Sequence, residues 1–184
     1  MLYRLRDKGL SIRVYDAADG VGGTWFWNRY PGARCDVESL EYSYQFSADL
    51  QQEWEWTERY AAQPEILSYI QHVADRFDLL RDIKLNTRVL AAQFDTNKEY
   101  WDIETDEEGS VSAKYFILAT GPLSSPFIPD ILGRNRFVGE QFHTGRWPKN
   151  HTDFSGKKVG VIGTGSSAVQ CIPIIAEQAD QLTV

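Results

Sequence analysis

Apolar residues recur at helical spacing in one stretch of the chain and alternate with polar residues in the next. Between residues 64 and 80 they return every three or four positions, which predicts a helix with Pro64 in its first turn. The apolar positions of this helix are Ile66, Ile70, Val73, Phe77 and Leu80. The strands predicted after it, with a hairpin turn at residues 106–110, cover residues 83–94, 100–105 and 111–121.

Continuous apolar runs predict a second kind of strand. Residues 115–121 form such a run, and we expect them to be a strand buried in a parallel sheet. Further strands are predicted at residues 11–16, 159–163 and 181–184. A helix ending near Gly9 precedes the first of these, and a helix over residues 166–178 precedes the last.

Asp16 closes the strand predicted at residues 11–16. In a dinucleotide-binding βαβ unit, an acid at the end of the second strand binds the ribose hydroxyls, about 20 residues after the phosphate-binding glycines. Counting back from Asp16 places those glycines ahead of Met1. The sequence therefore predicts an α/β fold with two dinucleotide-binding (Rossmann-like) units. We expect the sequence to start within the first helix of the first unit and to stop, near residue 184, before the second unit is complete.

Composition narrows the class of partners. The 184 residues are 42% hydrophobic and 24% charged, as in a globular domain with its own core. A net charge of −7 disfavours nucleic acid and anionic membranes, and no apolar run approaches the about 20 residues of a membrane span. Cys35 and Cys171 are far apart, which predicts neither a disulfide scaffold nor a redox pair. We therefore expect a cytoplasmic protein without nucleic-acid or membrane partners.

A glycine-rich turn follows the strand at residues 159–163 in the pattern G-x-G-x-x-A. Its residues are Gly163, Thr164, Gly165, Ser166, Ser167 and Ala168. The glycines allow a tight turn and a close approach of backbone N–H groups to a pyrophosphate, and the helix N-terminus favours the negative charge. A turn that only packs the sheet is the alternative. The strand before it and the helix after it favour nucleotide binding.

A second stretch, residues 20–36, combines glycines with large aromatic residues and is predicted to be a loop. Gly22 and Gly23 would let the chain approach a flat ligand, and Asp36 would add a negative charge beside it. Aromatic residues that could wall a ring system are Trp25, Trp27 and Tyr30. A turn over a core, with Arg34 and Asp36 in solvent, explains the same residues equally well.

The three histidines carry no sign of a metal site. His72 on the predicted helix and His151 in a polar loop are expected to be surface residues. His143 by itself is typical of a structural hydrogen-bonding residue, although its position between two nucleotide-binding units suits a hinge. No G-x-S-x-G or similar nucleophile motif is present.

Four motifs occur in the order found in Baeyer–Villiger monooxygenases, and the chain resembles that family over nearly its whole length. They are residues 22–39, the turn at residues 119–121, residues 137–148 and residues 160–170. The third fits F-x-G-x-x-x-H-T-x-x-W-P at every position. Its Trp147-Pro148 ending favours the phenylacetone and cyclohexanone monooxygenase group over the related N- and S-oxidising enzymes.

The resemblance implies two Rossmann-like units of the flavin monooxygenase type that bind FAD and NADP, both incomplete in this chain. Enzymes of this family use NADPH and O₂ to insert one oxygen atom beside the carbonyl of a small-molecule ketone, giving an ester or lactone. The implied division is a partial FAD-binding domain over residues 1–135, lacking its first strand and glycine turn, an interdomain linker over 136–155 and the start of an NADP-binding domain over 156–184. On this basis we expect a fragment that is inactive by itself.

The family's cofactor contacts can be carried onto matching positions. Asp16 would hold the FAD ribose, and the backbone of Val89 would contact the adenine side. The positions implied to line the flavin are Gly23, Thr24, Trp25, Asp36 and Tyr42, and those implied to border the nicotinamide are Arg34, Cys35 and Asp36. The NADP pyrophosphate would lie on Gly163, Thr164, Gly165, Ser166, Ser167, Ala168 and Val169. His143 and Trp147 would act in the linker, and Asp36 is the candidate catalytic residue.

Two parts of the family pattern have no match here. A downstream arginine that stabilises negative charge during the reaction cannot be assigned to any residue, nor can basic residues that would read the NADP 2′-phosphate. NADP rather than NAD therefore depends on the resemblance alone. An N- or S-oxidising flavin monooxygenase and a non-catalytic remnant remain alternatives. A disulfide reductase is disfavoured because no close cysteine pair follows residues 20–23.

Overall fold

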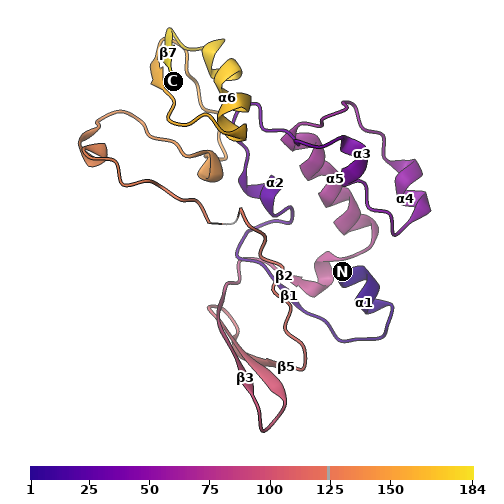
Figure 1. Ribbon diagram of the computed structural model, residues 1–184. Coiled ribbons are helices and arrows are strands. Elements are labelled where there is room, and N and C mark those ends of the chain that lie inside the picture. The colour runs from indigo at the N-terminus through magenta and orange to yellow at the C-terminus, as the bar shows by residue number, and fades with distance from the viewer. Residues whose placement is uncertain (124) are drawn as a thin grey trace. The chain divides into compact units, whose positions relative to one another are not determined.

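A computed structural model describes residues 1–123 and 125–184, which form two compact units (Figure 1). Unit 1 consists of Met1–Gly23 and Ile70–Thr120, and unit 2 of Thr24–Tyr69 and Gly121–Val184. Ser124 lies outside the described residues. The domain boundaries predicted at residues 135/136 and 155/156 divide the chain by the cofactor that each part would bind, whereas these units are defined by packing. The predicted boundaries therefore stay a prediction.

Unit 1 contains two short helical elements, the second of them a 3-10 helix, and five strands. Its elements are α1 (Leu2–Arg6), β1 (Val14–Tyr15), η1 (Leu80–Asp82), β2 (Ile83–Lys84), β3 (Val89–Asp95), β4 (Tyr100–Thr105) and β5 (Gly109–Ala113). β1 and β2 run parallel, with Val14 opposite Ile83. The predicted ending of the first helix is confirmed, because Gly9 adopts φ +70° and its N–H bonds to the Arg6 carbonyl.

The β3–β4–β5 sheet is antiparallel, and the hairpin predicted between β4 and β5 is confirmed. Trp101 of β4 lies between two other aromatic rings, 5.4 Å from Phe94 and 5.4 Å from Phe116. Ile103, on the same strand, is 5% exposed. The sheet therefore has one packed face, as the alternating pattern requires.

Unit 2 is mainly helical around an aromatic cluster. Its elements are α2 (Thr24–Trp27), α3 (Ser39–Tyr42), α4 (Ala48–Glu53), η2 (Arg134–Arg136), η3 (Thr144–Arg146), β6 (Lys158–Gly160), α6 (Ser166–Ala176) and β7 (Gln181–Thr183). The helix α5 (Gln63–Arg76) starts in this unit and continues into unit 1. Trp54 and Trp56 lie 5.2 and 5.0 Å from the buried Tyr69 ring, whose hydroxyl accepts the Tyr44 N–H at 2.7 Å.

A second apolar cluster joins residues 30–33 to Phe154 and to helix α6. Its buried members are Tyr30, Ala33, Phe154, Cys171 and Ile175. β6 and β7 pair in parallel beside α6, so the predicted strand–turn–helix–strand order is confirmed at these elements. Figure 1 shows β7 and α6 next to each other at the C-terminal end of the ribbon.

Several predictions about single elements were wrong. The strand predicted over residues 83–94 is two strands, β2 and β3, which belong to different sheets. Residues 115–121 form no strand, and Tyr115 and Leu118 are 70% and 73% exposed. No described strand pairs with them, and a parallel strand exists only through hydrogen bonds to a neighbour.

The helix predicted as far as residue 80 ends at Arg76, because Asp78 turns to φ 48° and Leu80 begins η1. The loop predicted over residues 20–36 contains the one-turn helix α2, in which Trp25 and Phe26 are buried. Burial of these two rings outweighs the preference for a loop that the neighbouring glycines indicate.

Candidate functional site

The turn before α6 leaves open space where a phosphate would lie. Gly163 adopts φ +117°, and a Cβ added to Gly163 or Gly165 would meet nothing within 4 Å. Gly165 is the N-cap of α6, and no side chain caps the helix there. The first N–H groups of a helix lack partners within it and favour negative charge. The turn therefore fits a dinucleotide pyrophosphate.

The remaining residues of the motif divide between solvent and core. Thr164, Ser166 and Val169 are exposed and Ser167 is half-buried. Ala168 is 8% exposed, and its small side chain suits a helix packed closely against a strand.

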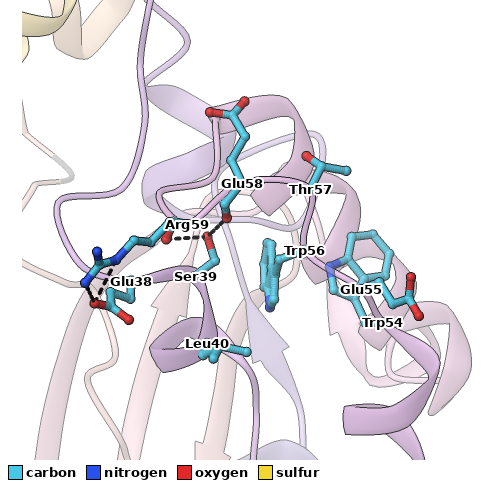
Figure 2. A pocket seen from close by; sticks show the side chains of 9 residues that line it. All are labelled: Glu38, Ser39, Leu40, Trp54, Glu55, Trp56, Thr57, Glu58 and Arg59. Atoms are coloured by element: carbon cyan, nitrogen blue, oxygen red, sulfur yellow. Dashed lines mark hydrogen bonds and ion pairs between the residues drawn. The ribbon is translucent and has the colours of Figure 1, made fainter.

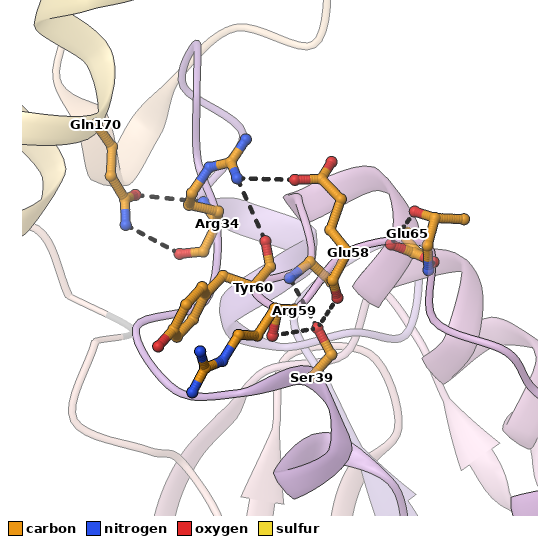
Figure 3. A network of polar contacts seen from close by, with 9 residues as sticks. Arg34, Ser39, Glu58, Arg59, Tyr60, Glu65 and Gln170 are labelled. Atoms are coloured by element: carbon orange, nitrogen blue, oxygen red, sulfur yellow. Dashed lines mark hydrogen bonds and ion pairs between the residues drawn. The ribbon is translucent and has the colours of Figure 1, made fainter.

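Residues 30–36 lie against α6 through the side chain of Gln170. Its amide bonds to the Arg34 backbone, as Figure 3 shows. It also bonds to the Tyr30 hydroxyl and to the Asp36 carboxylate. Asp36 and Arg34 are exposed, whereas Cys35 is 2% exposed and its N–H bonds to the Ala61 carbonyl at 3.0 Å. The segment therefore presents two opposite charges to solvent, while Cys35 between them is enclosed by the protein.

Arg34 is held from its other side by residues 58–60. Its Nη1 lies 3.0 Å from Glu58 Oε2 and donates to the Tyr60 carbonyl at 3.3 Å (Figure 3). The same stretch is anchored by Ser39, whose hydroxyl donates to the Glu58 carbonyl and accepts the Ala61 N–H. Ser39 is 2% exposed, so these bonds satisfy an otherwise buried hydroxyl.

The predicted flavin-lining residues of unit 2 lie together around α2. Trp25 packs edge-on against Tyr42 with ring centroids 5.6 Å apart, and its carbonyl accepts the Gln63 side-chain N–H at 2.5 Å. Thr24 begins the helix and is exposed. Burial, together with Cys35 and Asp36 nearby, raises the pKa of Tyr42, so its phenol stays protonated at neutral pH.

Unit 1 contains the other predicted cofactor residues, which are Asp16, Gly23 and Val89. Asp16 follows β1, its N–H bonds to the Lys84 carbonyl at 3.0 Å, and its Oδ1 accepts the Ala18 N–H at 2.9 Å. These bonds fix the carboxylate at the end of the strand. Gly23 has φ +52° and space around it, and Val89 starts β3 next to an irregularity in the strand register.

The predicted linker residues His143 and Trp147 have structural contacts in unit 2. His143 Nδ1 accepts the Gly145 N–H at 3.1 Å, so its other nitrogen, Nε2, carries the hydrogen that bonds to the Phe127 carbonyl at 3.1 Å. Trp147 lies 5.2 Å from the Phe142 ring and 6.2 Å from Phe154. The linker motif is thus fastened to the core that also contains Cys171 of α6.

Among residues 1–123 and 125–184, no group of His, Cys, Asp and Glu side chains is arranged to hold a metal ion. Within the same residues, every helix is too short or too polar to cross a bilayer. Both cysteines are buried free thiols.

Residues 37–184 match the family described as "Pyridine nucleotide-disulphide oxidoreductase". The chain belongs to this family. Within it, the expected relation to Baeyer–Villiger monooxygenases is confirmed by relatives and by solved structures.

The relatives include oxidising enzymes of more than one kind. An acetone monooxygenase (methyl acetate-forming) from Gordonia sp. (strain TY-5) is 45% identical over 100% of this chain and 34% of its own length. A phenazine N-monooxygenase from Lysobacter antibioticus is 46% identical over 100% of this chain and 34% of its own. The chain thus spans about a third of the length of the curated relatives it matches.

Solved structures agree with the fold. "Oxidized steroid monooxygenase bound to NADP" superposes with a TM-score of 0.94 at 58% identity, over 98% of this chain and 35% of that one. A complex of OTEMO with FAD and NADP superposes with a TM-score of 0.92 at 44% identity, over 98% and 35%. The predicted fold class, partial Rossmann-like units of the flavin monooxygenase type, is therefore confirmed.

Sequence reasoning missed several residues that shape this family member's site. Gln170 lies two positions after Ala168, the last residue of the glycine motif, and no local signal marked it because its partners are distant in the sequence. A groove of about 540 Å³, shown in Figure 2, was also missed. It is lined by Glu38, Ser39, Leu40, Trp54, Glu55, Trp56, Thr57, Glu58 and Arg59. Its tryptophans belong to the aromatic cluster around Tyr69, which gives them a packing role.

Proposed function

We propose that this sequence works within an FAD- and NADPH-dependent monooxygenase that inserts one oxygen atom of O₂ beside a ketone carbonyl. The balanced reaction consumes ketone, O₂, NADPH and a proton, and gives an ester or lactone, NADP⁺ and water. Support comes from the motif order, from the acetone monooxygenase relative and from similarity to structures that contain FAD and NADP. A cytoplasmic location and the domain division at residues 135/136 and 155/156 belong to the same proposal.

The open turn before α6 is the observation that carries the proposal. Gly163 and Gly165 leave room for a pyrophosphate, and the N–H groups that start α6 would bind it. Asp16 would accept hydrogen bonds from the FAD ribose hydroxyls. When bound, the two cofactors would supply the electrons and the activation of O₂.

The protein's own residues near the reaction would orient the reacting groups and shield them from solvent. Trp25 and Tyr42 form an apolar wall, and the neutral Tyr42 phenol adds no charge to it. Arg34 and Asp36 would border the nicotinamide, where their exposed side chains would present opposite charges to it. Asp36 is the residue we propose as catalytic.

N-oxidation is the second candidate function. The phenazine N-monooxygenase relative is as similar to this chain as the ketone oxidiser is, at 46% against 45% identity. A shared cofactor region fits both reactions, because the cofactors activate O₂ in either case while the substrate pocket selects the acceptor.

The test is product analysis with the full-length gene product that carries this sequence. The purified protein is expected to show flavin absorbance, to oxidise NADPH in the presence of a cyclic ketone and to form the lactone. Parallel reactions with an aromatic amine and a sulfide test the second candidate. Lactone absent while N-oxide accumulates would replace the first function by the second, and absence of bound flavin would reject both. The 184 residues alone serve as a control and are expected not to turn over.

A further inference from the structure

The side-chain amide of Gln170 makes four hydrogen bonds to one segment of unit 2. Its Oε1 accepts the Tyr30 hydroxyl at 2.8 Å and the Arg34 N–H at 3.3 Å. Its Nε2 donates to the Arg34 carbonyl at 3.1 Å and to Asp36 Oδ1 at 2.9 Å. A glutamine amide has two acceptor positions and two N–H donors, so its capacity is fully used.

Gln170 also lies close to the proposed nucleotide site. It follows Ser166 by four residues on α6, which puts both on one face of the helix, one turn apart. Figure 3 shows its side chain extending from α6 to the backbone of Arg34. The amide therefore connects the start of the nucleotide-binding helix to the segment with the two exposed charges.

Packing alone does not require this amide. Ala33 and Cys171, 5% and 3% exposed, belong to the apolar cluster that holds the segment on α6. That cluster is non-directional and leaves the exposed Asp36 carboxylate free to rotate. The bond from Gln170 Nε2 is directional, and it determines where the carboxylate lies.

We propose that Gln170 is a positioning residue that fixes Arg34 and Asp36 relative to the nucleotide bound at the start of α6. The inference rests on the proposed function, and it identifies the contact through which nucleotide binding and Asp36 are linked. Loss of this contact misplaces Asp36 at the nicotinamide, so it slows reduction of the flavin by bound NADPH more than it weakens NADPH binding.

The test uses Gln170→Leu and Gln170→Glu in the full-length, FAD-loaded protein. Stopped-flow measurement of flavin bleaching by NADPH gives the reduction rate at saturation and the Kd separately. Gln170→Leu keeps the volume and loses all four bonds. We expect its reduction rate to fall by about tenfold or more, since small misplacements of reacting groups are costly, while its Kd changes by less than about threefold.

Gln170→Glu adds a readout that a purely structural role would not move. Its introduced carboxylate faces the Asp36 carboxylate and the Arg34 carbonyl, so it repels both at neutral pH. Protonation of that carboxyl restores an O–H donor, and we expect the defect to shrink as the pH falls, whereas the defect of Gln170→Leu stays constant relative to the unsubstituted protein. Matched controls are Gln52→Leu and Gln52→Glu, at an exposed position of α4.

A third readout needs no cofactor. Hydrogen exchange of the FAD-free protein, followed by mass spectrometry, should show faster exchange across residues 30–36 in Gln170→Leu and no change in the β3–β4 hairpin. If Gln170→Leu and Gln170→Glu reduce flavin at the rate of the unsubstituted protein, the inference is overturned while the proposed function stands. Equal losses in rate and affinity, independent of pH, would also overturn it. Failure of the unsubstituted protein to bind FAD would reject the proposed function itself.

Discussion

Gly32 and Gln170 approach so closely that a Cβ on the glycine would lie 2.4 Å from the Gln170 backbone oxygen. The same Cβ would be 3.1 Å from Ile174 Cγ1, and Gly32 has φ +77°. Residues 30–36 and α6 are therefore in contact through backbone as well as through the Gln170 side chain. This contact makes the geometry of the exposed charges Arg34 and Asp36 depend on the position of α6.

Gly32→Ala is expected to destabilise the chain strongly. The positive φ costs about 1–2 kcal/mol for a non-glycine residue, and the backbone contact adds to that. Gly156→Ala is the matched control, because Gly156 has φ +71° and no atom within 4 Å of its Cβ. Urea unfolding should give a free energy loss for Gly32→Ala that exceeds the control by at least about 1 kcal/mol. Equal losses would mean that the segment moves away from α6 at no cost.

Phe154→Ala is expected to lower the free energy of unfolding by about 3–5 kcal/mol, because Phe154 is 4% exposed and packs in the cluster with Tyr30 and Cys171. Phe127→Ala provides the comparison, since Phe127 is 81% exposed and should change stability by less than about 0.5 kcal/mol. Both values come from chemical denaturation followed by tryptophan fluorescence. A small effect at Phe154 would show that the cluster does not hold unit 2 together.

Periodicity predicted those elements that local residues determine. The spacing of Ile66, Ile70 and Val73 gave α5, and the turn at residues 106–110 gave the β4–β5 hairpin. Residues 115–121 were predicted wrongly because a parallel strand depends on a partner that is distant in sequence, and no apolar pattern reports whether the partner is there.

In the candidate site, too, the features that local residues determine were predicted and those that depend on distant contacts were not. The phosphate turn follows from its glycines, whose backbone requirement is local. The role of Gln170 could not be predicted, because it comes from contacts with Tyr30 and Asp36, which precede it in the chain by 140 and 134 positions. Cys35 was expected beside the nicotinamide, and the structure adds that its thiol is buried. Its predicted place beside the nicotinamide stays a prediction.

His143→Ala should lower stability by about 0.5–2 kcal/mol, the range found when a helix-capping side chain is removed. His143 Nδ1 accepts the Gly145 N–H at the start of η3. His143→Asn places an oxygen near the same position, so it should recover a large part of the loss. Thermal unfolding of the two variants distinguishes this capping role from an exclusively hinge role, for which both would unfold like the unsubstituted chain.

Asp82→Asn should remove a part of the stability that depends on pH. Hydrogen bonding to Arg6, whose Nη2 lies 2.5 Å from Asp82 Oδ2, lowers the pKa of Asp82. Because the folded-state pKa is depressed, this contribution is complete above the unfolded value of about 3.9 and is lost as the pH falls through the folded-state pKa. The Tm difference between the unsubstituted chain and the variant should therefore be present near neutral pH and disappear in strong acid. Asp75→Asn, at an exposed position of α5, is the matched control for the loss of one carboxylate.

Gly165→Ala is expected to impair nucleotide binding without impairing folding. Gly165 has φ −75°, which alanine adopts freely, and its added Cβ would meet no atom within 4 Å. Stability should therefore stay within about 0.5 kcal/mol of the unsubstituted protein. The methyl group would occupy the space through which a pyrophosphate approaches the backbone, so the Kd for NADP should rise by about tenfold or more. Gly160→Ala, in β6 and equally open, is the control and should leave the Kd unchanged. Isothermal titration of both variants decides the point: if their Kd values are equal, the pyrophosphate does not lie on Gly165, and the turn before α6 only connects a strand to a helix.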